Sequence, residues 1–512
     1  MLENNKRIAK NTLFLYVRMI IIMGVSLYTS RVILDKMGID DFGLYNVVGG
    51  VVGLLSFISG TLSIGTLRFL TVELGRKDYA GLHVTFNTAF YTHLLVGLLL
   101  AFLLETGGLW FVYHKLVIPE GRLSAALIAY HISVFTSIIS MALVPYTSLI
   151  MAHERMGIYA YISIFETVAK LLVVYLLSIS DYDKLIVYAI LIAFVQLLVS
   201  LIYYIYCNHY FVESRLGIIF KKETFKSLLN FSGWNILANV AETLKLQGYL
   251  VLINMFFQPF VVTAQAIGNQ VAGAMMQFIN NFRTAINPQI IKLYAAGDYE
   301  GSKRLTFNTT ILVFDLVMLL GLPTIFVLDT IMRLWLVEVP PYAVLFTQYI
   351  IVQRILSTFD AAFYIPMMAA GKIKTNSILA SIFGPGSFFI LYIVFELGGD
   401  VMWLQYIGVI GITIYSFFVK PYIVVHDKIE GYSFRDFLPC TLTCLKVAAL
   451  SVSLSYIAYL LLGNTTIISS ILLFLVSMVS VLAASYFFLD SYMKMWVRGK
   501  VGLLFVKLRN ML

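Results

Sequence analysis

The chain has 512 residues, of which 60% are apolar and 12% are charged, and its mean hydropathy is +0.88. A soluble globular domain has about 45–50% apolar and about 25% charged residues. The composition therefore excludes a disordered or disulfide-built protein and argues against a large water-soluble catalytic domain. The net charge of +9 fits the Lys and Arg of cytoplasmic loops, so no nucleic-acid partner is expected. We predict an all-α polytopic membrane protein.

Apolar stretches of about 20 residues, the length of a membrane-spanning helix, recur along the whole chain. The first stretch lacks a small-residue cleavage motif, which favours a retained span over a signal peptide. The connections are short, so no separate soluble domain is expected between the spans. We predict about fourteen spans, at residues 12–34, 43–66, 84–104, 122–146, 158–179, 185–207, 229–257, 261–287, 305–328, 344–368, 377–397, 402–425, 441–462 and 466–489.

The basic residues orient these spans. With the N-terminus inside, most of the 36 Lys and Arg residues fall in the inner loops and tails. Because cytoplasmic loops of membrane proteins are enriched in Lys and Arg, both termini are predicted to be cytoplasmic. An even number of spans agrees with this orientation.

An internal repeat joins residues 78–88 (DYAGLHVTFNT) to residues 298–309 (DYEGSKRLTFNT) at an offset of 220 to 221. The offset separates six predicted spans from six, and an even number returns the chain to the same side of the membrane. Two halves with the same orientation, related by an axis along the membrane normal, form a known transporter architecture. We predict a six-helix lobe at 1–220, a second at 221–435, and two further helices with a basic tail at 436–512.

The predicted eighth span carries amides on one side and apolar residues on the other. At about 100° per residue the amides fall within an arc of roughly 120°. Such a face is costly against lipid and must contact protein or water. Two interpretations stay open: hydrogen bonds between helices, or a water-filled cavity whose amides suit sugar hydroxyls. The amides are Asn269, Gln270, Gln277, Asn280, Asn281 and Asn287.

Charged residues also lie inside the predicted first and seventh spans. Asn235, Asn239, Glu242 and Lys245 share one face of the seventh span. Glu242 and Lys245, at i and i+3, either neutralise each other or leave Glu242 to contact an ion or the substrate. Arg18 has no acid at i±3 or i±4. A charge of this kind indicates a functional site, unless the side chain extends to the inner headgroups.

Other charged residues favour a structural interpretation. Glu166 and Lys170, at i and i+4, are predicted to pair, and Asp315, Arg354 and Asp360 can bridge the ninth and tenth spans. The sequence contains no nucleotide-binding loop, dinucleotide fingerprint, metalloprotease motif or catalytic triad signature. We therefore predict no enzyme activity and no cofactor.

Residues 6–50 contain a basic lead-in, Arg18 and Arg31 around the first span, and a G-x-x-x-F-G-x-Y motif at 38–45. With these features the start of the chain resembles polysaccharide flippases of the Wzx type. These flippases belong to the MOP exporter superfamily, which also contains MATE-type multidrug exporters and the lipid II flippase. The two-lobe arrangement extends the resemblance over about residues 1–425.

The resemblance implies alternating-access transport of an undecaprenyl-diphosphate-linked oligosaccharide from the inner to the outer leaflet of the bacterial cytoplasmic (inner) membrane. The product would be a surface polysaccharide such as the O-antigen of lipopolysaccharide, and the partners would include the polymerase and the chain-length machinery. Arginine suits a diphosphate because it donates two parallel hydrogen bonds. In the lipid II flippase, arginines of the first, second and eighth spans line the cavity. The comparable residues here are Arg18, Arg31, Arg68 and Arg283.

Two alternatives remain. The first is a cation-coupled multidrug exporter of the MATE type, with Glu242 and Asp360 placed like acids that bind a coupling Na⁺ or H⁺. The chain lacks the first-span Asp of proton-coupled exporters, which disfavours this alternative. The second is a polymerase or glycosyltransferase of the same pathway. The longest outer loop, at about 105–121, has Lys115 as its only Lys or Arg, which disfavours an enzyme.

Overall fold

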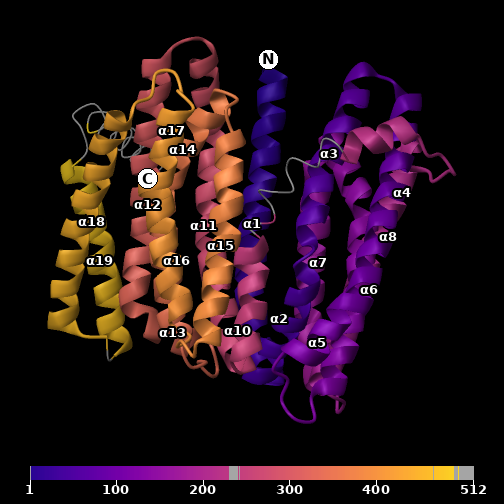
Figure 1. Cartoon of the computed structure of the whole chain (residues 1–512), viewed down its shortest axis with the longest axis horizontal. Helices are drawn as coiled ribbons and strands as arrows, with labels where there is room; N and C mark the ends of the chain where they lie inside the picture. Colours follow the sequence, from indigo (N-terminus) through magenta and orange to yellow (C-terminus); the bar gives the residue numbers. More distant parts are fainter. Residues whose placement is uncertain (1, 230–239, 241–242, 465, 489–493, 495–512) are drawn as a thin grey trace, which may run out of the picture. The chain divides into compact units, whose positions relative to one another are not determined.

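The computed structural model describes the chain apart from residues 1, 230–239, 241–242, 465, 489–493 and 495–512. It describes side chains from Met19 onward, apart from these gaps and positions 245, 278, 280–282, 284, 285, 288 and 361. All regular structure within the described residues is helical (Figure 1), which confirms the all-α class.

Nine helical segments of the described chain are long and apolar enough to cross a bilayer. They are Tyr79–Lys115 (α4 Tyr79–Leu103, a π-helical turn, α5 Leu109–Lys115), α6 (Leu123–Ala152), α7 (Met156–Ile179), α8 (Lys184–Tyr210), α12 (Tyr299–Trp335), α15 (Lys374–Glu396), Trp403–His426 (α16 Trp403–Ile414, a π-helical turn, α17 Lys420–His426), α18 (Phe434–Leu462) and α19 (Ile467–Phe488). The chain is thus a multi-pass membrane protein; the total of fourteen spans stays a prediction.

The predicted second span is broken. Helices α2 (Ile39–Gly53) and α3 (Ser56–Arg76) meet at a bend of 52°, and together they make a tenth candidate span. Glycines let α2 approach its neighbours closely. A Cβ on Gly43 would lie 2.1 Å from the carbonyl oxygen of Pro259, and one on Gly53 would lie 3.1 Å from Gln247 Cδ. A larger residue at position 43 would have to move the backbone of Pro259.

The described chain forms two compact units that interleave in sequence. Unit 1 comprises Met1–Gln270, Trp335–Phe346 and Ser377–Leu404, and unit 2 comprises Val271–Leu334, Thr347–Asn376 and Gln405–Leu512. Helix α15 lies in unit 1, where Tyr249 Oη lies 2.8 Å from Ser387 Oγ. The lobe boundaries at 220 and 435 stay predictions of the repeat.

Unit 1 is built around α6, which packs against α2, α3, α4 and α8. Helix α1 (Leu2–Met37) lies along α7, and the hydroxyls of Tyr28 and Tyr175 lie 2.8 Å apart. The unit also contains α10 (Tyr249–Phe256) and the start of α11 (Pro259–Ala295). This packing places α1, α2, α6, α7 and α8 around one interior.

Unit 2 holds α12, α14 (Thr358–Ala369), α17, α18 and α19, with the remainder of α11 and of α13 (Ala343–Leu356). A buried apolar cluster joins four of these helices. Its members are Phe314, Met318 and Leu322 of α12, Phe359 of α14, Cys444 and Val447 of α18, and Val481 and Ala484 of α19. The two C-terminal helices are therefore packed into the core of unit 2.

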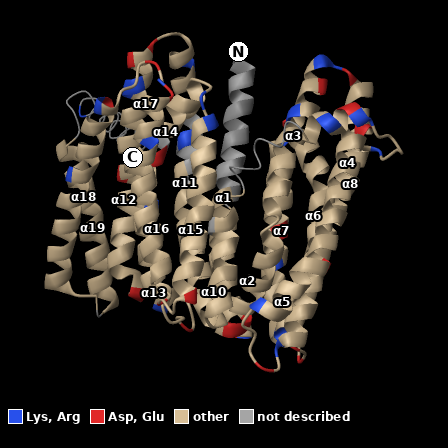
Figure 2. Cartoon of the chain, viewed as in Figure 1, with Lys and Arg blue, Asp and Glu red and all other residues tan. Residues whose placement is uncertain are grey.

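The surfaces of the helices are apolar along most of their length. In each unit, Lys, Arg, Asp and Glu gather near helix ends and are sparse in between (Figure 2). Large side chains such as Leu98 and Phe102 of α4, and Ile471 and Leu475 of α19, are exposed. An exposed apolar surface of this extent suits hydrocarbon as its solvent.

The repeated sequence forms the same turn twice. Asp78 Oδ1 accepts a hydrogen bond from the Gly81 amide at 2.8 Å, and Asp298 Oδ1 accepts one from Gly301 at 2.8 Å. A Cβ on either glycine would lie within 2.4 Å of its aspartate. Asp at the N-cap satisfies a free amide of the helix that follows. The Asp-x-x-Gly match therefore encodes one helix–turn–helix in each half.

An ionic cluster joins the starts of three helices in unit 1. Arg122, at the N-cap of α6, donates from Nε to Asp41 Oδ1 at 2.9 Å and also pairs with Asp183, the N-cap of α8. Burial raises the pKa of Asp183, but hydrogen bonds from Arg122 and from the Ile186 and Leu185 amides outweigh burial and hold that pKa below its usual value.

Candidate functional site

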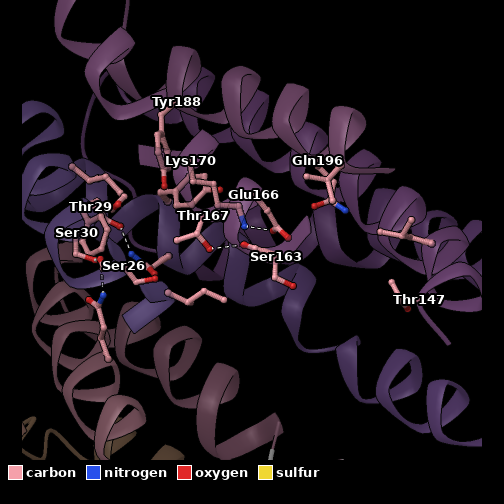
Figure 3. Close-up of a pocket in the computed structure, with 18 of the residues that line it drawn as sticks. Ser26, Thr29, Ser30, Thr147, Ser163, Glu166, Thr167, Lys170, Tyr188 and Gln196 are labelled. Atoms are coloured by element: carbon pink, nitrogen blue, oxygen red, sulfur yellow. Dashed lines mark hydrogen bonds and ion pairs between the residues drawn. The ribbon is translucent and has the colours of Figure 1, made fainter. Parts of the chain in front are cut away.

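Unit 1 contains an open cavity of about 540 Å³ between α1, α2, α6, α7, α8 and the start of α11 (Figure 3). Its volume lies within the range of small-molecule sites, about 300–1,000 Å³. Most of the lining residues carry a polar group, although the surrounding helices are apolar. The polar lining residues are Ser26, Thr29, Ser30, Tyr45, Asn46, Thr147, Tyr159, Ser163, Glu166, Thr167, Lys170, Tyr188, Gln196, Tyr203 and Gln270.

Helix α7 supplies the longest polar stripe of this cavity. Ser163, Glu166, Thr167 and Lys170 follow one another at i, i+3, i+4 and i+7, a spacing that places them on one face of a helix. Figure 3 shows these four side chains along the same side of the helix. They lie near the middle of a 24-residue span, so the stripe sits at mid-membrane depth.

Four hydroxyl groups of the cavity are already used as donors. Ser30, Thr147, Ser163 and Thr167 each donate to a backbone carbonyl of their own helix, at 2.7–3.1 Å. A hydroxyl has one proton and two acceptor lone pairs. These side chains therefore offer mainly acceptors to whatever occupies the cavity.

The charged residues in the lining are one acid and one base. Lys170 Nζ lies 2.6 Å from Glu166 Oε1, which confirms the predicted i, i+4 pair. Their side chains are 40% and 29% exposed, so the pair opens onto the cavity instead of being sealed by packing. The lining has no net charge, and a water-filled cavity makes an ion pair tolerable at this depth.

Aromatic and amide groups complete the wall. The rings of Tyr45 and Tyr188 meet edge to face with centroids 4.8 Å apart. Tyr45 belongs to the motif at residues 38–45, and Phe42 of the same motif also lines the cavity. Gln270 donates to the Ser26 carbonyl at 3.1 Å, which keeps its amide at the cavity wall.

Among the described side chains that the sequence singled out, Gln270 lines this cavity and several others do not. Asn269 Oδ1 accepts from Gln265 at 3.4 Å. Arg31 is exposed, and the guanidinium of Arg68 lies 5.9 Å from the ring centre of Phe69. These residues lie outside the cavity lining.

Other predicted site residues fall outside the described part of the chain. Asn235, Asn239 and Glu242 lie in the gaps at 230–239 and 241–242, and the side chains of Arg18, Asn280 and Asn281 also lie outside it. Gln277 is described and exposed, within unit 2. The roles assigned to all these residues stay predictions.

Unit 2 holds a second group of charged residues. Lys420 Nζ lies 2.8 Å from Asp360 Oδ1, and the lysine side chain is 2% exposed. The ammonium also lies 5.2 Å from the ring centres of both Tyr364 and Tyr415. Arg283, on α11, donates to the Thr358 carbonyl close to Asp360 in the chain, at 3.2 Å. Asp360 and Arg283, both predicted site residues, are thus near neighbours within unit 2.

The sequence interpretation missed two features. Ser163 and Thr167 flank the Glu166–Lys170 pair at helical spacing, and that spacing is the signal for a polar face on α7. Lys420 lies inside the predicted span at 402–425 but has no acid at i±3 or i±4, so the sequence gives no sign of its partner. Its burial depends on a partner 60 residues earlier, which no local pattern reveals.

No protein-family model matches this sequence, and no curated protein matches it either. Solved structures do match. The lipid II flippase MurJ, in its inward closed conformation, has a TM-score of 0.69 and 13% identity, covering 93% of this chain and 98% of that chain. An inward-facing multidrug resistance MATE family transporter of the MOP superfamily has a TM-score of 0.64 and 12% identity, covering 80% and 94%.

A third match is the MATE multidrug transporter DinF-BH, in a complex with a small molecule, with a TM-score of 0.61 and 12% identity, covering 83% of this chain and 96% of that chain. The chain has the fold of these transporters. At 12–13% identity, residue roles do not transfer with the fold, and the narrower resemblance to Wzx-type flippases stays a prediction.

Proposed function

We propose that this protein moves an undecaprenyl-diphosphate-linked oligosaccharide from the inner to the outer leaflet of the bacterial cytoplasmic membrane by alternating access. The observation that carries the proposal is the polar cavity of about 540 Å³ inside membrane-spanning helices. Polar groups are expensive in a bilayer unless they serve a polar occupant. The headgroup of such a lipid is polar, whereas its tail can stay in the hydrocarbon.

The length of the matching structures supports a flippase over an exporter. The match to MurJ covers 93% of this chain. The matches to the MATE structures cover 80–83% of this chain, and they include 94–97% of the length of those structures. The exporters are therefore shorter than this chain. We attribute part of this difference to helices α18 and α19, which pack on α12 through Cys444 and Val481.

The diphosphate requires cations, and Arg283 is the described candidate with the most suitable surroundings. It is half-buried, and one of its five N–H donors goes to the Thr358 carbonyl. The remaining donors are able to bind phosphate oxygens. Arg18, Arg31 and Arg68 remain part of the same proposal, as do cytoplasmic termini and a polymerase with chain-length machinery as partners.

The exporter alternative is less well supported at Asp360. A coupling Na⁺ or H⁺ on this carboxylate would have to compete with Lys420, a buried cation already 2.8 Å away. The matched MATE structures keep the alternative open, and it makes a different prediction. An exporter should change drug sensitivity and leave surface glycan intact.

Deletion of the gene tests the proposal. We expect lipid-linked repeat units to accumulate on the cytoplasmic side and surface glycan to be lost. Complementation with Arg283→Ala should restore little glycan at normal protein level, while Arg304→Ala, an exposed arginine of α12, should restore it fully. Normal glycan together with altered drug sensitivity in the deletion strain would overturn the flippase and favour the exporter.

A further inference from the structure

The unit 1 cavity is chemically unlike a phosphate site. Its charged lining residues, Glu166 and Lys170, neutralise each other at 2.6 Å. A diphosphate or a sugar carboxylate placed here would find no unpaired cation in the lining. Burying an ionised group without a partner costs far more than burying a hydrogen-bonded neutral one.

The hydrogen-bonding groups point to the same conclusion. Four hydroxyls donate their protons to backbone carbonyls and leave only acceptor lone pairs for a ligand. They belong to Ser30, Thr147, Ser163 and Thr167. A phosphate or a carboxylate only accepts hydrogen bonds, so these four side chains offer it no donor. A sugar hydroxyl both donates and accepts, and it pairs with such oxygens.

The amides supply the complementary donors. Asn46 uses one N–H on the Phe42 carbonyl at 2.7 Å, and Gln270 uses one on the Ser26 carbonyl at 3.1 Å. An amide group has two N–H donors and a carbonyl oxygen, so each retains a donor and an acceptor. Beside them the tyrosine rings of positions 45 and 188 form a wall with apolar faces, against which the C–H face of a sugar ring can pack.

We infer that the unit 1 cavity is a binding site for uncharged sugar residues, and that the Glu166–Lys170 pair sets its preference for neutral over acidic saccharides. The inference rests on the proposed function and adds the class of headgroup. The diphosphate must then bind elsewhere. Lys170 would be able to bind an anion if Glu166 were not already paired with it.

The test compares two lipids in proteoliposomes of the full-length protein. Both are polyprenyl-diphosphate disaccharides, one made of two glucoses and the other ending in glucuronic acid. Because lipid and diphosphate are shared, the ratio of their translocation rates reports on the sugar alone. We expect the wild type to move the neutral lipid about tenfold faster, a difference of about 1.4 kcal/mol.

Glu166→Gln should abolish this preference, since it leaves the Lys170 ammonium unpaired in the cavity. We expect the acidic-to-neutral ratio to rise about tenfold. The double variant Glu166→Gln with Lys170→Met removes both charges and should return the ratio to the wild-type value. Equal translocation rates for the two lipids in the wild type, with the same result in Glu166→Gln, would overturn the inference.

A binding measurement separates this inference from the proposed function. Saturation-transfer NMR of free maltotriose with the detergent-solubilised protein should show contact that Thr167→Val weakens about threefold, the value of one hydrogen bond. Thr71→Val is the matched control, because Thr71 makes the same bond to its own helix but is exposed outside the cavity.

The two failures are distinguishable. If neither lipid moves but maltotriose binds and Thr167→Val weakens it, the sugar site stands and flipping fails. If both lipids move, Glu166→Gln does not change their rates and maltotriose shows no contact, then flipping stands and the sugar site fails.

Discussion

Lys420 shows how a buried charge is made stable in the hydrocarbon region. Its side chain is 2% exposed, its ammonium is 2.8 Å from Asp360, and two tyrosine rings flank it at 5.2 Å. The aromatic faces add cation–π attraction, which strengthens when water is absent. The phenol of Tyr415 is itself fixed by donating to Asn376 Oδ1 at 3.2 Å. Asp360 and its surroundings therefore form a structural unit with an internal cation.

Asp360→Asn should destabilise the protein strongly, because it leaves the Lys420 ammonium buried without a counter-charge. We expect a loss of about 3–5 kcal/mol in the free energy of unfolding, measured by thermal and chemical unfolding in detergent. Adding Lys420→Met should recover most of the loss. Asp329→Asn is the control, since its pair with Arg333 is exposed and such pairs contribute at most about 1 kcal/mol.

The opposite outcome would point to ion coupling. If Asp360→Asn left stability unchanged and instead removed a Na⁺ or H⁺ dependence of transport, Asp360 would be a coupling-ion site and the pair with Lys420 would be incidental.

Asp183 makes a pH-dependent contribution to stability. Its pKa in the folded protein lies below the usual 3.8, so its contribution is complete above about pH 4 and is lost as the pH falls through the lowered pKa. Asp183→Asn should cost about 1–2 kcal/mol at pH 7 and should show a smaller further loss in acid. Unfolding curves from pH 7 to 3 measure both effects.

The control for this prediction is Asp35→Asn, whose carboxylate pairs with the adjacent Lys36 at 2.8 Å on the surface. It should follow the wild-type curve. Equal acid losses in wild type and Asp183→Asn would show that the ionic cluster with Arg122 does not stabilise the folded chain.

At the level of single residues, the sequence predicted a local ion pair and one cavity amide, but no pair between distant residues. Gln270 lines the cavity and Glu166 pairs with Lys170 as their spacing indicated. The pair of Asp360 with Lys420 joins two helices that are far apart in sequence. Helical periodicity defines a polar face but not the helix that faces it.

At the scale of elements, side chains of α4 hold the backbone of the segment at 215–221, which follows α8. Asn87 is fully buried; its Oδ1 accepts from the Gly217 amide at 2.8 Å, and its Nδ2 donates to the Arg215 carbonyl at 3.3 Å. Thr88 Oγ1 accepts from the Lys221 amide at 3.1 Å. The second copy of the repeat contacts the segment after α17 differently, through the hydroxyl of Tyr432.

Asn87→Ala should release this segment. It leaves the Gly217 amide and the Arg215 carbonyl without their partner, at a cost of about 1–3 kcal/mol. Hydrogen exchange at Gly217 should accelerate at least about tenfold. Thr92→Val, also fully buried in α4 but bonded to its own helix at 2.6 Å, should leave that amide protected. Unchanged exchange in Asn87→Ala would contradict the assigned role.

The existence of the helices followed from apolar length, whereas their breaks did not. Residues 43–66 read as one span, yet the chain bends by 52° between α2 and α3. Helix α2 packs closely on its neighbours, with Gly43 against Pro259 and Gly53 against Gln247. Those partners lie far along the chain. The glycines alone therefore predicted close packing but not a bend in the helix.

For the whole molecule, the repeat and the charges together predict that both halves cross the membrane in the same direction. The turns at Asp78 and Asp298 match in geometry, which supports a duplication of structure as well as of sequence. The turns do not fix orientation, because inverted halves could contain them equally. The basic residues of the loops carry that part of the argument.

Labelling of single cysteines in intact cells tests this orientation. Glu120 and Glu338 lie about one repeat apart, in loops predicted to face outward, and Lys222 and Lys428 lie in loops predicted to face the cytoplasm; all four are exposed. An impermeant maleimide should label Glu120→Cys and Glu338→Cys, and should label the other two only after lysis. The native cysteines are buried, so background should be low. Labelling of Glu120→Cys together with protection of Glu338→Cys would indicate inverted halves, and the predicted pair of lobes with the same orientation would then have to be abandoned.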